Sequence, residues 1–209
     1  MRLRYKPNAI DELKGNPLMI FEAEKFKGKW KEVFKNENPI ELEIGSGKGD
    51  FVKQMALENP DKNYLALDTA IKALVLASRK FDKDDTPNIR AIIGDAEDIV
   101  DMFDKDEISK IYLNFSTPWP KRKHHKRRLS HKVFLDRYKK IVKKGAVLEL
   151  KTDNREFFDD TLKYLEENDL EILKKNYDIS VEESKVLTEY ERKWRRKSIP
   201  ICFVRARFR

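Results

Sequence analysis

From residue 40 onwards, short apolar runs alternate with segments of helical pattern, and this alternation restricts the fold more than any other feature. The apolar runs fall at residues 40–45, 63–68, 88–93, 108–115 and 145–151, and the helical patterns fall near 48–58, 69–82, 96–103, 131–143 and 155–168. Strands that alternate with helices form βαβ units, which place the strands in a mostly parallel sheet with helices on both faces. The chain is therefore predicted to adopt an α/β fold.

The end of the chain departs from this pattern. Residues 170–178 and 199–208 read as strands, and only a short helical pattern at 188–196 separates them. Without a full crossover helix between them, these two strands are expected to pair antiparallel as a C-terminal hairpin. A mostly parallel sheet of seven strands that ends in such a hairpin resembles the layout of the Rossmann-like class I methyltransferases.

The first 38 residues are expected to form an N-terminal extension to a single domain that comprises residues 1–209. A helix is predicted over 17–35, where aromatic residues recur at roughly helical spacing, as in a stripe that faces a core. These aromatic residues are Phe21, Phe26, Trp30 and Phe34. Asn38-Pro39 ends the pattern.

Several functional classes are disfavoured by what the sequence lacks. No run of about 18 apolar residues occurs, and the first ten residues, MRLRYKPNAI, lack the apolar core of a signal peptide. The single cysteine, Cys202, excludes a disulfide framework, and the presence of only three histidines argues against a metal-ligand cluster. We therefore expect a soluble cytoplasmic protein that binds no metal.

The charged residues are segregated along the chain. Residues 114–144 carry 12 Lys and Arg against one acid, and residues 192–209 carry eight and no acid. These two segments hold a net charge of +19, which leaves −11 for the other 160 residues in a chain of net charge +8. Segregation of this size favours an anionic partner such as nucleic acid, with an acidic protein surface or membrane headgroups as alternatives.

A glycine turn follows the first predicted strand of the sheet, in the segment ELEIGSGKGDF at 41–51. Gly45, Gly47 and Gly49 would let the backbone turn tightly and approach a bound ligand. The segment is not a Walker A loop, because Gly49 stands after Lys48 where a serine or threonine would hold magnesium.

Acidic residues surround this turn. Glu43 precedes it, Asp68 ends the second strand and Asp95 ends the third. Such acids would repel a pyrophosphate and suit a cationic ligand, so S-adenosylmethionine, which has a sulfonium and no phosphate, is favoured over NAD. The alternative is that Glu43 and Asp68 only cap strands and pair with lysines.

A basic corner follows the fourth predicted strand, in NFSTPWPKRKHHKRR at residues 114–128. Six of the eight residues at 121–128 are Lys or Arg, and those at its end, Lys126, Arg127 and Arg128, are expected to contact RNA phosphates. The alternative for the run is a solvated loop. Trp119 could stack on a base or wedge the corner against the sheet.

Four segments in this order and spacing, ELEIGSGKGDF, NFSTPWPKRKHHKRRL, LELKTDN and LTEYERKW, resemble the bacterial tRNA (guanine-N7)-methyltransferase family. The resemblance runs from about residue 40 to the C-terminus, and the PWPK block and the T-x-Y-E element are its most diagnostic parts. It implies methylation of guanosine 46 in the tRNA variable loop, with S-adenosylmethionine as the donor. The partner is then tRNA, and the chain could be a monomer or a homodimer.

The resemblance also implies functional residues. The family's cofactor contacts fall on Glu43, Asp68 and Asp95, with Thr117 at a further contact position, and the glycine turn adds Gly45 and Gly47 as cofactor-binding candidates. The substrate-binding positions fall on Lys121, Asp153, Thr188, Glu189, Tyr190 and Glu191. Guanine N7 carries a free lone pair, so the reaction needs alignment and stabilisation of a cationic ring more than a general base. Asp153 and Glu191 are the candidate catalytic residues for that stabilisation.

Some positions leave alternatives open. Lys121 could be a solvated lysine, and Asp153 could only cap the helix that begins near residue 154. His124, His125 and His131 are expected to contact phosphate or lie at the surface rather than catalyse. Thr117 stands where the family commonly has aspartate, and Asp68 stands where glutamate is usual.

Two other functions compete with this one. NFSTPWP loosely resembles the Asn-Pro-Pro-aromatic motif of methyltransferases that act on exocyclic amines, but three residues separate its asparagine from the first proline. An inactive RNA-binding module with the same fold is the other alternative, against which the acids around the glycine turn argue.

Overall fold

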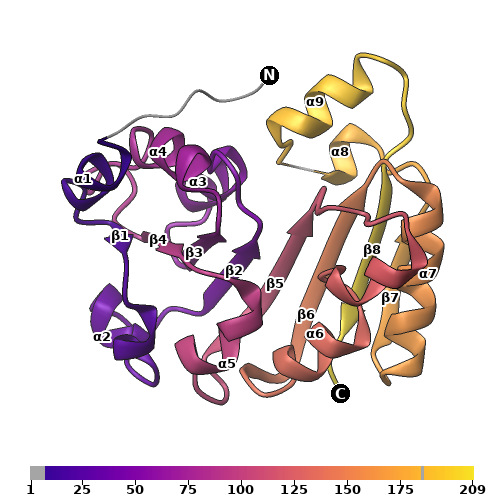
Figure 1. Cartoon of the computed structure of the whole chain (residues 1–209), viewed down its shortest axis with the longest axis horizontal. Coiled ribbons are helices and arrows are strands. Elements are labelled where there is room, and N and C mark those ends of the chain that lie inside the picture. The colour runs from indigo at the N-terminus through magenta and orange to yellow at the C-terminus, as the bar shows by residue number, and fades with distance from the viewer. Residues whose placement is uncertain (1–7, 185) are drawn as a thin grey trace.

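The computed structural model of the chain describes residues 8–184 and 186–209. Its strands form one eight-stranded sheet in the order β1-β4-β3-β2-β5-β6-β8-β7 (Figure 1). The strands are β1 Met19–Ile20, β2 Ile40–Ile44, β3 Asn63–Asp68, β4 Ile89–Ile93, β5 Ile108–Asn114, β6 Val142–Thr152, β7 Glu171–Asn176 and β8 Cys202–Arg207. The helices are α1 Ala9–Lys14, α2 Trp30–Phe34, α3 Asp50–Glu58, α4 Ile71–Ser78, α5 Ile99–Met102, α6 Lys132–Tyr138, α7 Arg155–Glu167, α8 Val181–Ser184 and α9 Glu189–Arg195, with 3-10 turns η1 Ala23–Phe26, η2 Ala96–Asp98 and η3 Arg122–Arg127.

Alternation along the strands divides the core into two layers. On β2, Ile40, Leu42 and Ile44 pack into a large apolar cluster with residues of α5, α6 and α7. A second cluster joins the opposite face of β3 and β4 to α1, α3 and α4. Helices therefore cover both faces of the sheet, as predicted, since successive strand residues point to opposite faces.

The connections place a crevice at the middle of the sheet. From β2 the chain runs to β3 and β4 on one side, and it then returns to β5, which pairs parallel with β2 on the other side. The carboxyl ends of β2 and β5 therefore lie side by side at a change of direction in the strand order, which is where open α/β sheets bind ligands.

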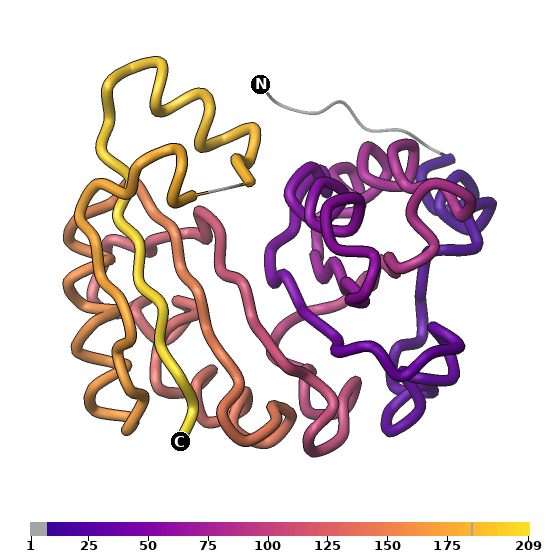
Figure 2. The backbone as a smooth tube through the Cα atoms, turned by 180° about the vertical axis from the view of Figure 1, so that it is seen from behind, coloured from indigo at the N-terminus to yellow at the C-terminus, as the bar shows by residue number. Residues whose placement is uncertain are grey.

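The antiparallel end of the sheet is confirmed. β8 pairs antiparallel with both β6 and β7, and so lies between them. The connection from β7 to β8 carries the short helices α8 and α9, which lie beyond the carboxyl end of β6 (Figure 2). This places the T-x-Y-E element at the same edge of the sheet as the glycine turn.

The prediction of one helix over 17–35 is wrong. The segment contains strand β1, which pairs parallel with β4, then η1 and the five-residue helix α2. Gly28 interrupts it with a φ of +76°, a left-handed conformation that a helix does not continue through. The sheet consequently has eight strands instead of seven.

The aromatic residues of this segment do belong to the core in part. Trp30 is fully buried, and its indole nitrogen donates to the carbonyl of Met102 over 2.9 Å. Phe34 is also buried, whereas Phe21 is exposed. Residues 1–7, which begin the predicted N-terminal extension, lie outside the described residues, and the extent of a single domain over 1–209 stays a prediction.

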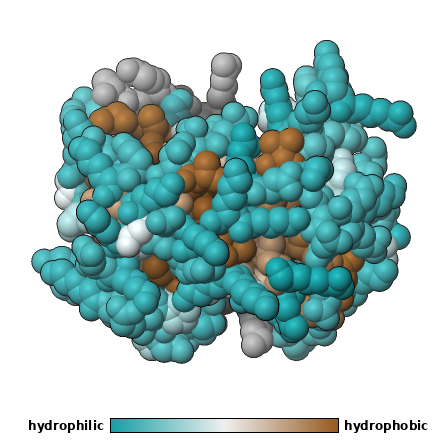
Figure 3. Space-filling model, turned by 90° about the horizontal axis from the view of Figure 1, so that it is seen from below, coloured by the Kyte–Doolittle hydropathy of each residue, from teal (hydrophilic) through white to brown (hydrophobic). Residues whose placement is uncertain are grey.

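The surface is consistent with the composition of the chain. Seen from below, it is largely hydrophilic, with hydrophobic side chains gathered in smaller patches (Figure 3). Within the described ranges, no helix combines the length and apolar character needed to span a membrane.

Candidate active site at the carboxyl edge of the sheet

The glycine turn has the backbone geometry that its composition predicts. Gly45, Gly47 and Gly49 have φ values of +79°, +56° and +72°. At Gly49 a Cβ atom would also lie 2.4 Å from the ring of Phe81, so a larger residue would force this helix start away from α4. The turn is held to the next strand, since the amides of Gly45 and Ser46 donate to the carbonyl of Leu67.

Asp68 fixes the other side of the turn. One carboxylate oxygen accepts from the amide of Gly47 and the other from the amide of Ala70, each over 2.7 Å. Each carboxylate oxygen has a second lone pair, so Asp68 can still accept a hydrogen bond from a ligand hydroxyl.

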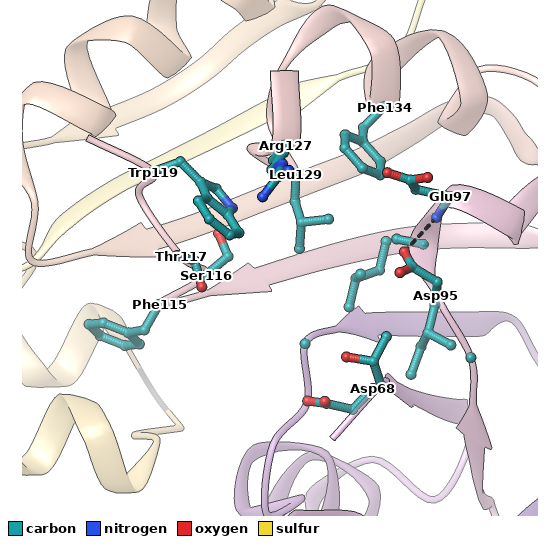
Figure 4. Close-up of a pocket in the computed structure, with 16 residues that line it drawn as sticks. Asp68, Asp95, Glu97, Phe115, Ser116, Thr117, Trp119, Arg127, Leu129 and Phe134 are labelled. Carbon is teal, nitrogen blue, oxygen red and sulfur yellow. Dashed lines mark hydrogen bonds between the residues drawn. The ribbon is translucent and has the colours of Figure 1, made fainter. Parts of the chain in front are cut away.

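A cleft of about 410 Å³ opens between these elements and the end of β5 (Figure 4). Its lining includes the predicted cofactor residues Gly45, Asp68, Asp95 and Thr117. Asp95 begins η2, where its carboxylate accepts from the amide of Glu97 over 2.9 Å. With Glu97, three carboxylates and one cation, Arg127, line a space within the range of small-ligand sites.

The apolar wall of the cleft comes from β2, β3, α6 and the segment just before α6. It is formed by Ile44, Leu67, Leu129 and Phe134. A ligand with one flat apolar part and one cationic part matches this division, because the acids gather on the side of Asp68 and Asp95 and Phe134 faces them (Figure 4).

Glu43 lies beneath the turn and does not line the cleft. One carboxyl oxygen accepts from the side-chain amide of Asn114 over 2.8 Å, and the other is buried without a partner in the described chain. Burial raises the pKa of Glu43 to about 8. A cation bound above it would favour its charged form, so the carboxyl group fits a cationic ligand even at this depth.

The Pro-Trp-Pro corner closes the cleft from the side of β5. Phe115 and Trp119 have left-handed φ values of +52° and +41°, which are costly for aromatic residues and turn the chain sharply after the strand. Ser116, Thr117 and Trp119 line the cleft. The guanidinium of Arg127 lies over the Trp119 ring at 5.1 Å.

The basic run divides into an exposed part and one buried anchor. Lys121, Arg122, Lys123 and Lys126 are exposed, and none forms an ion pair within the described chain. Arg128 is 1% exposed, and it donates to the carbonyl of Pro118 and to Asp160, each over 2.7 Å. The expectation that Arg128 contacts RNA phosphate is therefore wrong, because its guanidinium holds the corner from inside.

Asp153 is available for a ligand. It directly follows β6 and is partly buried, and no hydrogen bond or ion pair of its side chain occurs within the described residues. The helix that follows is capped by the neighbouring residue, since the Asn154 side chain accepts from the amide of Phe157 over 2.8 Å. Capping by Asp153, the alternative left open by the sequence, is thus excluded.

The T-x-Y-E element forms the start of α9. Thr188 caps the helix by accepting from the amide of Glu191 over 2.9 Å, and Glu189 pairs with Lys48 of the glycine turn at 2.7 Å. Tyr190 is 45% exposed and packs on Phe115 with ring centroids 5.3 Å apart. Glu189 and Tyr190 therefore contact elements that border the cleft, the glycine turn and Phe115.

Glu191 is placed differently from its neighbours. It is fully buried, and its carboxylate accepts from Lys151, Ser184 and Arg195. This burial argues against direct contact with a substrate and favours a role in holding α9.

Several residues of the site were not identified from the sequence. Glu97 and Phe134 were not singled out. Asn114 was considered only as part of the rival Asn-Pro-Pro-aromatic motif, although its position as the last residue of β5 is a signal that it lies near the cleft. Phe134 comes from α6, and no local pattern marks an aromatic helix residue as a wall of a cleft.

Comparisons with known proteins agree with this geometry. A family model described as "Putative methyltransferase" matches residues 37–204. The chain is 43% identical to the tRNA (guanine-N(7)-)-methyltransferase of Listeria monocytogenes over all of this chain and 99% of that protein. It is 41% identical to the enzyme of the same name from Clostridium acetobutylicum, with 98% of each chain covered.

Solved structures share the fold. A 16S rRNA methyltransferase, KamB, matches with a TM-score of 0.65 at 14% identity, over 87% of this chain and 93% of that one. A 16S rRNA (adenine(1408)-N(1))-methyltransferase solved with the cosubstrate SAM matches with a TM-score of 0.61 at 13% identity, over 86% and 90%. At these identities the likeness supports the class I methyltransferase fold alone.

Proposed function

Because this chain belongs to the tRNA (guanine-N7)-methyltransferase family, we propose that it transfers a methyl group from S-adenosylmethionine to N7 of guanosine 46 in the tRNA variable loop. One observation carries the proposal: an acidic cleft at the ends of β2, β3 and β4 adjoins a rim of exposed cations that form no ion pair with any described residue. The acidic cleft suits the cationic donor, and the adjacent cationic rim suits the polyanionic acceptor.

The residues of the cleft fit the donor. Asp68 stands where an acid accepts from ribose hydroxyls, and Asp95 stands where an acid accepts from the adenine amino group. Gly45 and Gly47 leave room for the methionine part close to the backbone, with the Glu43 carboxyl group beneath. Thr117 lines the cleft with a neutral hydroxyl in place of the family's aspartate.

The proposed reaction requires no proton transfer by a side chain of the protein. S-adenosylmethionine, when bound, supplies an electrophilic methyl group, and its transfer to N7 leaves a neutral sulfur and a cationic guanine ring. N7 has a free lone pair and no proton to lose, so no side chain has to act as a base. The residues instead hold the guanine in line and stabilise its developing charge.

Asp153 is the residue we assign to that charge. It directly follows β6 at the same edge of the sheet as the cleft, and its carboxylate is not engaged within the described residues. A carboxylate already in place is more effective than solvent, because it does not have to reorient as the ring becomes cationic. Tyr190 and Thr188 lie on the neighbouring helix, where we place the nucleoside.

The tRNA is proposed to dock on two groups of cations. One is the exposed part of η3 with Lys121, and the other is the outer surface of α9 and the residues after it, with Arg192, Lys193, Arg196 and Lys197. Contacts of this kind give affinity and register and do not read the base sequence. A tRNA substrate also suits the predicted cytoplasmic location, which stays a prediction.

Nucleoside mass spectrometry of incubated tRNA tests this function. With unmodified tRNA and S-adenosylmethionine, we expect N7-methylguanosine, and none when the donor is omitted. N6-methyladenosine would instead support an exocyclic-amine methyltransferase. Binding of tRNA without any methylated nucleoside, and without heat on titration with the donor, would support an inactive RNA-binding module.

A further inference from the structure

The ammonium group of one lysine of the sheet makes all its hydrogen bonds within the described chain to the helical segment that carries the proposed substrate residues. Lys151 is the next-to-last residue of β6 and is 4% exposed. Its ammonium donates to the carbonyl of Val186 over 3.1 Å, to the carbonyl of Ser184 over 3.3 Å, and to the Ser184 hydroxyl. It also lies 3.1 Å from the carboxylate of Glu191.

The same carboxylate has a second cation. Arg195 pairs with Glu191 at 2.7 Å and also donates to the carbonyl of Ile179 over 2.7 Å. Glu191 is therefore buried between a lysine of β6 and an arginine at the end of α9. Charges are removed from water at a high cost, so such a cluster persists only where its hydrogen bonds are well formed.

These bonds add a polar anchor to the apolar contacts of α9, in which Tyr190 packs on Phe115 and Trp194 packs against the cluster of Ile179, Ile201 and Phe203. The helix α9 has seven residues, and helices this short are unstable on their own. Its other bond to the sheet side of the cleft is the Lys48–Glu189 pair, whose side chains are 42% and 62% exposed. Exposed pairs contribute little, so the buried cluster around Lys151 is the stronger of the two polar attachments of α9.

The position of Lys151 in the chain couples two parts of the proposed acceptor site. Asp153 follows it by two residues, and Thr188, Glu189 and Tyr190 lie on the helix that its ammonium holds. A shift of α9 relative to β6 would thus change the distance between Asp153 and the residues around Tyr190. Misplacement by about 1 Å can reduce a rate by about 10²-fold.

We propose that Lys151 is a positioning residue, which fixes α8 and α9 against β6 so that the acceptor guanine meets Asp153 in a defined place. This inference rests on the proposed function. Lys151 does not line the donor cleft, and all the hydrogen bonds of its ammonium go to the acceptor side, so its main effect is expected there.

The test compares Lys151→Met with Lys174→Met in the full chain. Removing Lys151 leaves Glu191 and Arg195 as a balanced pair, so the variant is expected to fold. Lys174 pairs with Glu183 of α8 from an exposed position on β7, and it is the matched control for loss of a lysine bound to this segment. Hydrogen exchange, donor affinity by calorimetry and tRNA kinetics are measured for both variants.

For Lys151→Met, we expect amide exchange in residues 186–195 to accelerate by about tenfold or more, with the exchange of β2, β3 and β5 unchanged. The value of kcat/KM for tRNA falls by about tenfold or more, while the affinity for S-adenosylmethionine is retained. Lys174→Met changes none of these. If Lys151→Met is too unstable to measure, Ser184→Ala, which removes the hydroxyl between Lys151 and Glu191, must give the same local pattern.

Two results would overturn the inference. One is that Lys151→Met leaves both the exchange of residues 186–195 and the tRNA kinetics as in the wild type, when the wild type itself methylates tRNA. The other is accelerated exchange throughout the sheet with loss of donor binding, which would make Lys151 a general support of the fold. If wild-type protein forms no N7-methylguanosine, the proposed function fails, and the exchange data still decide whether Lys151 holds α9.

Discussion

The guanidinium of Arg128 lies 2.7 Å from the carboxylate of Asp160, and this pair fastens the Pro-Trp-Pro corner to α7. Pro118 and Trp119 lie beyond the last residue of β5, so no backbone amide of a neighbouring strand donates to their carbonyls within the described chain. Arg128 supplies donors to both carbonyls, at 2.7 Å and 3.5 Å. The arginine thereby stabilises a corner whose tryptophan has a left-handed backbone.

Arg128→Ala should destabilise the protein by about 3 kcal/mol, because it empties a buried site, leaves two carbonyls without their donor and leaves Asp160 with the more distant Lys163 at 3.8 Å. Thermal or denaturant unfolding measures this loss. The matched control is Lys126→Ala, an exposed cation of the same run, which should change stability by less than about 0.5 kcal/mol. Equal effects of the two substitutions would mean that Arg128 is not an anchor.

The exposed cations should carry the salt dependence of tRNA binding. Replacing Lys121, Arg122, Lys123 and Lys126 with alanine should weaken binding and lower the slope of log K against log salt by about 3, since each phosphate contact contributes about 0.7 to 0.9. Filter binding at several salt concentrations gives the slope. The double variant Lys25→Ala/Lys31→Ala, which removes lysines paired with nearby glutamates, should leave it unchanged. A slope that does not change in the quadruple variant would remove the docking role of η3.

Asp153→Ala should lower the single-turnover methylation rate by about 10²-fold or more and largely spare tRNA affinity, because its proposed role is to stabilise charge that develops only during transfer. Rapid-quench measurements with saturating tRNA and donor report the rate. Asn154→Ala is the control: it removes the cap of α7 and should cost about 1 kcal/mol of stability with little effect on the rate. Parallel losses of binding and rate in Asp153→Ala would contradict the assignment.

Glu43 should make the ligand-free protein less stable as pH rises. Burial raises the pKa of this carboxyl group to about 8 from its ordinary 4.5, so the folded chain holds a proton that the unfolded chain releases between these values. The contribution of Glu43 to stability is therefore fully present below pH 4.5 and is lost as pH rises through about 8.

Glu43→Gln has no proton to lose at this position. Its free energy of unfolding, relative to that of the wild type, should rise from about pH 5 to about pH 9, as measured by denaturant titrations without ligand. Parallel curves for the two proteins would mean that Glu43 does not titrate in this range.

Much of the site could be predicted because it is built from strand ends. Asp68 and Asp95 follow apolar runs, and parallel strands that pair in one sheet bring their carboxyl ends to one edge. The glycine turn was equally readable, because glycines at that position serve a backbone with positive φ. These features depend on local sequence and on a regular topology.

The rest depended on which way individual side chains point. In a run of six cations nothing in the sequence marks Arg128 as the one that turns inward, since this is decided by the carbonyls left open at Pro118 and Trp119. Glu191 reads as one acid of an exposed helix, yet Lys151 and Arg195 draw it into the interior. The aromatic spacing of 17–35 likewise resembled a helix, although Gly28 and the pairing of β1 with β4 prevent one.

Methyl transfer to a tRNA transcript that carries 7-deazaguanosine at position 46 tests the central claim most directly. The analogue keeps the shape and the other edges of guanine and replaces only the N7 atom. With a methyl-labelled donor, we predict label in the guanosine transcript and none in the 7-deaza transcript, while both compete equally for binding. Equal labelling of the two transcripts would contradict the claim that an acidic cleft presents a methyl group to N7 of this guanosine.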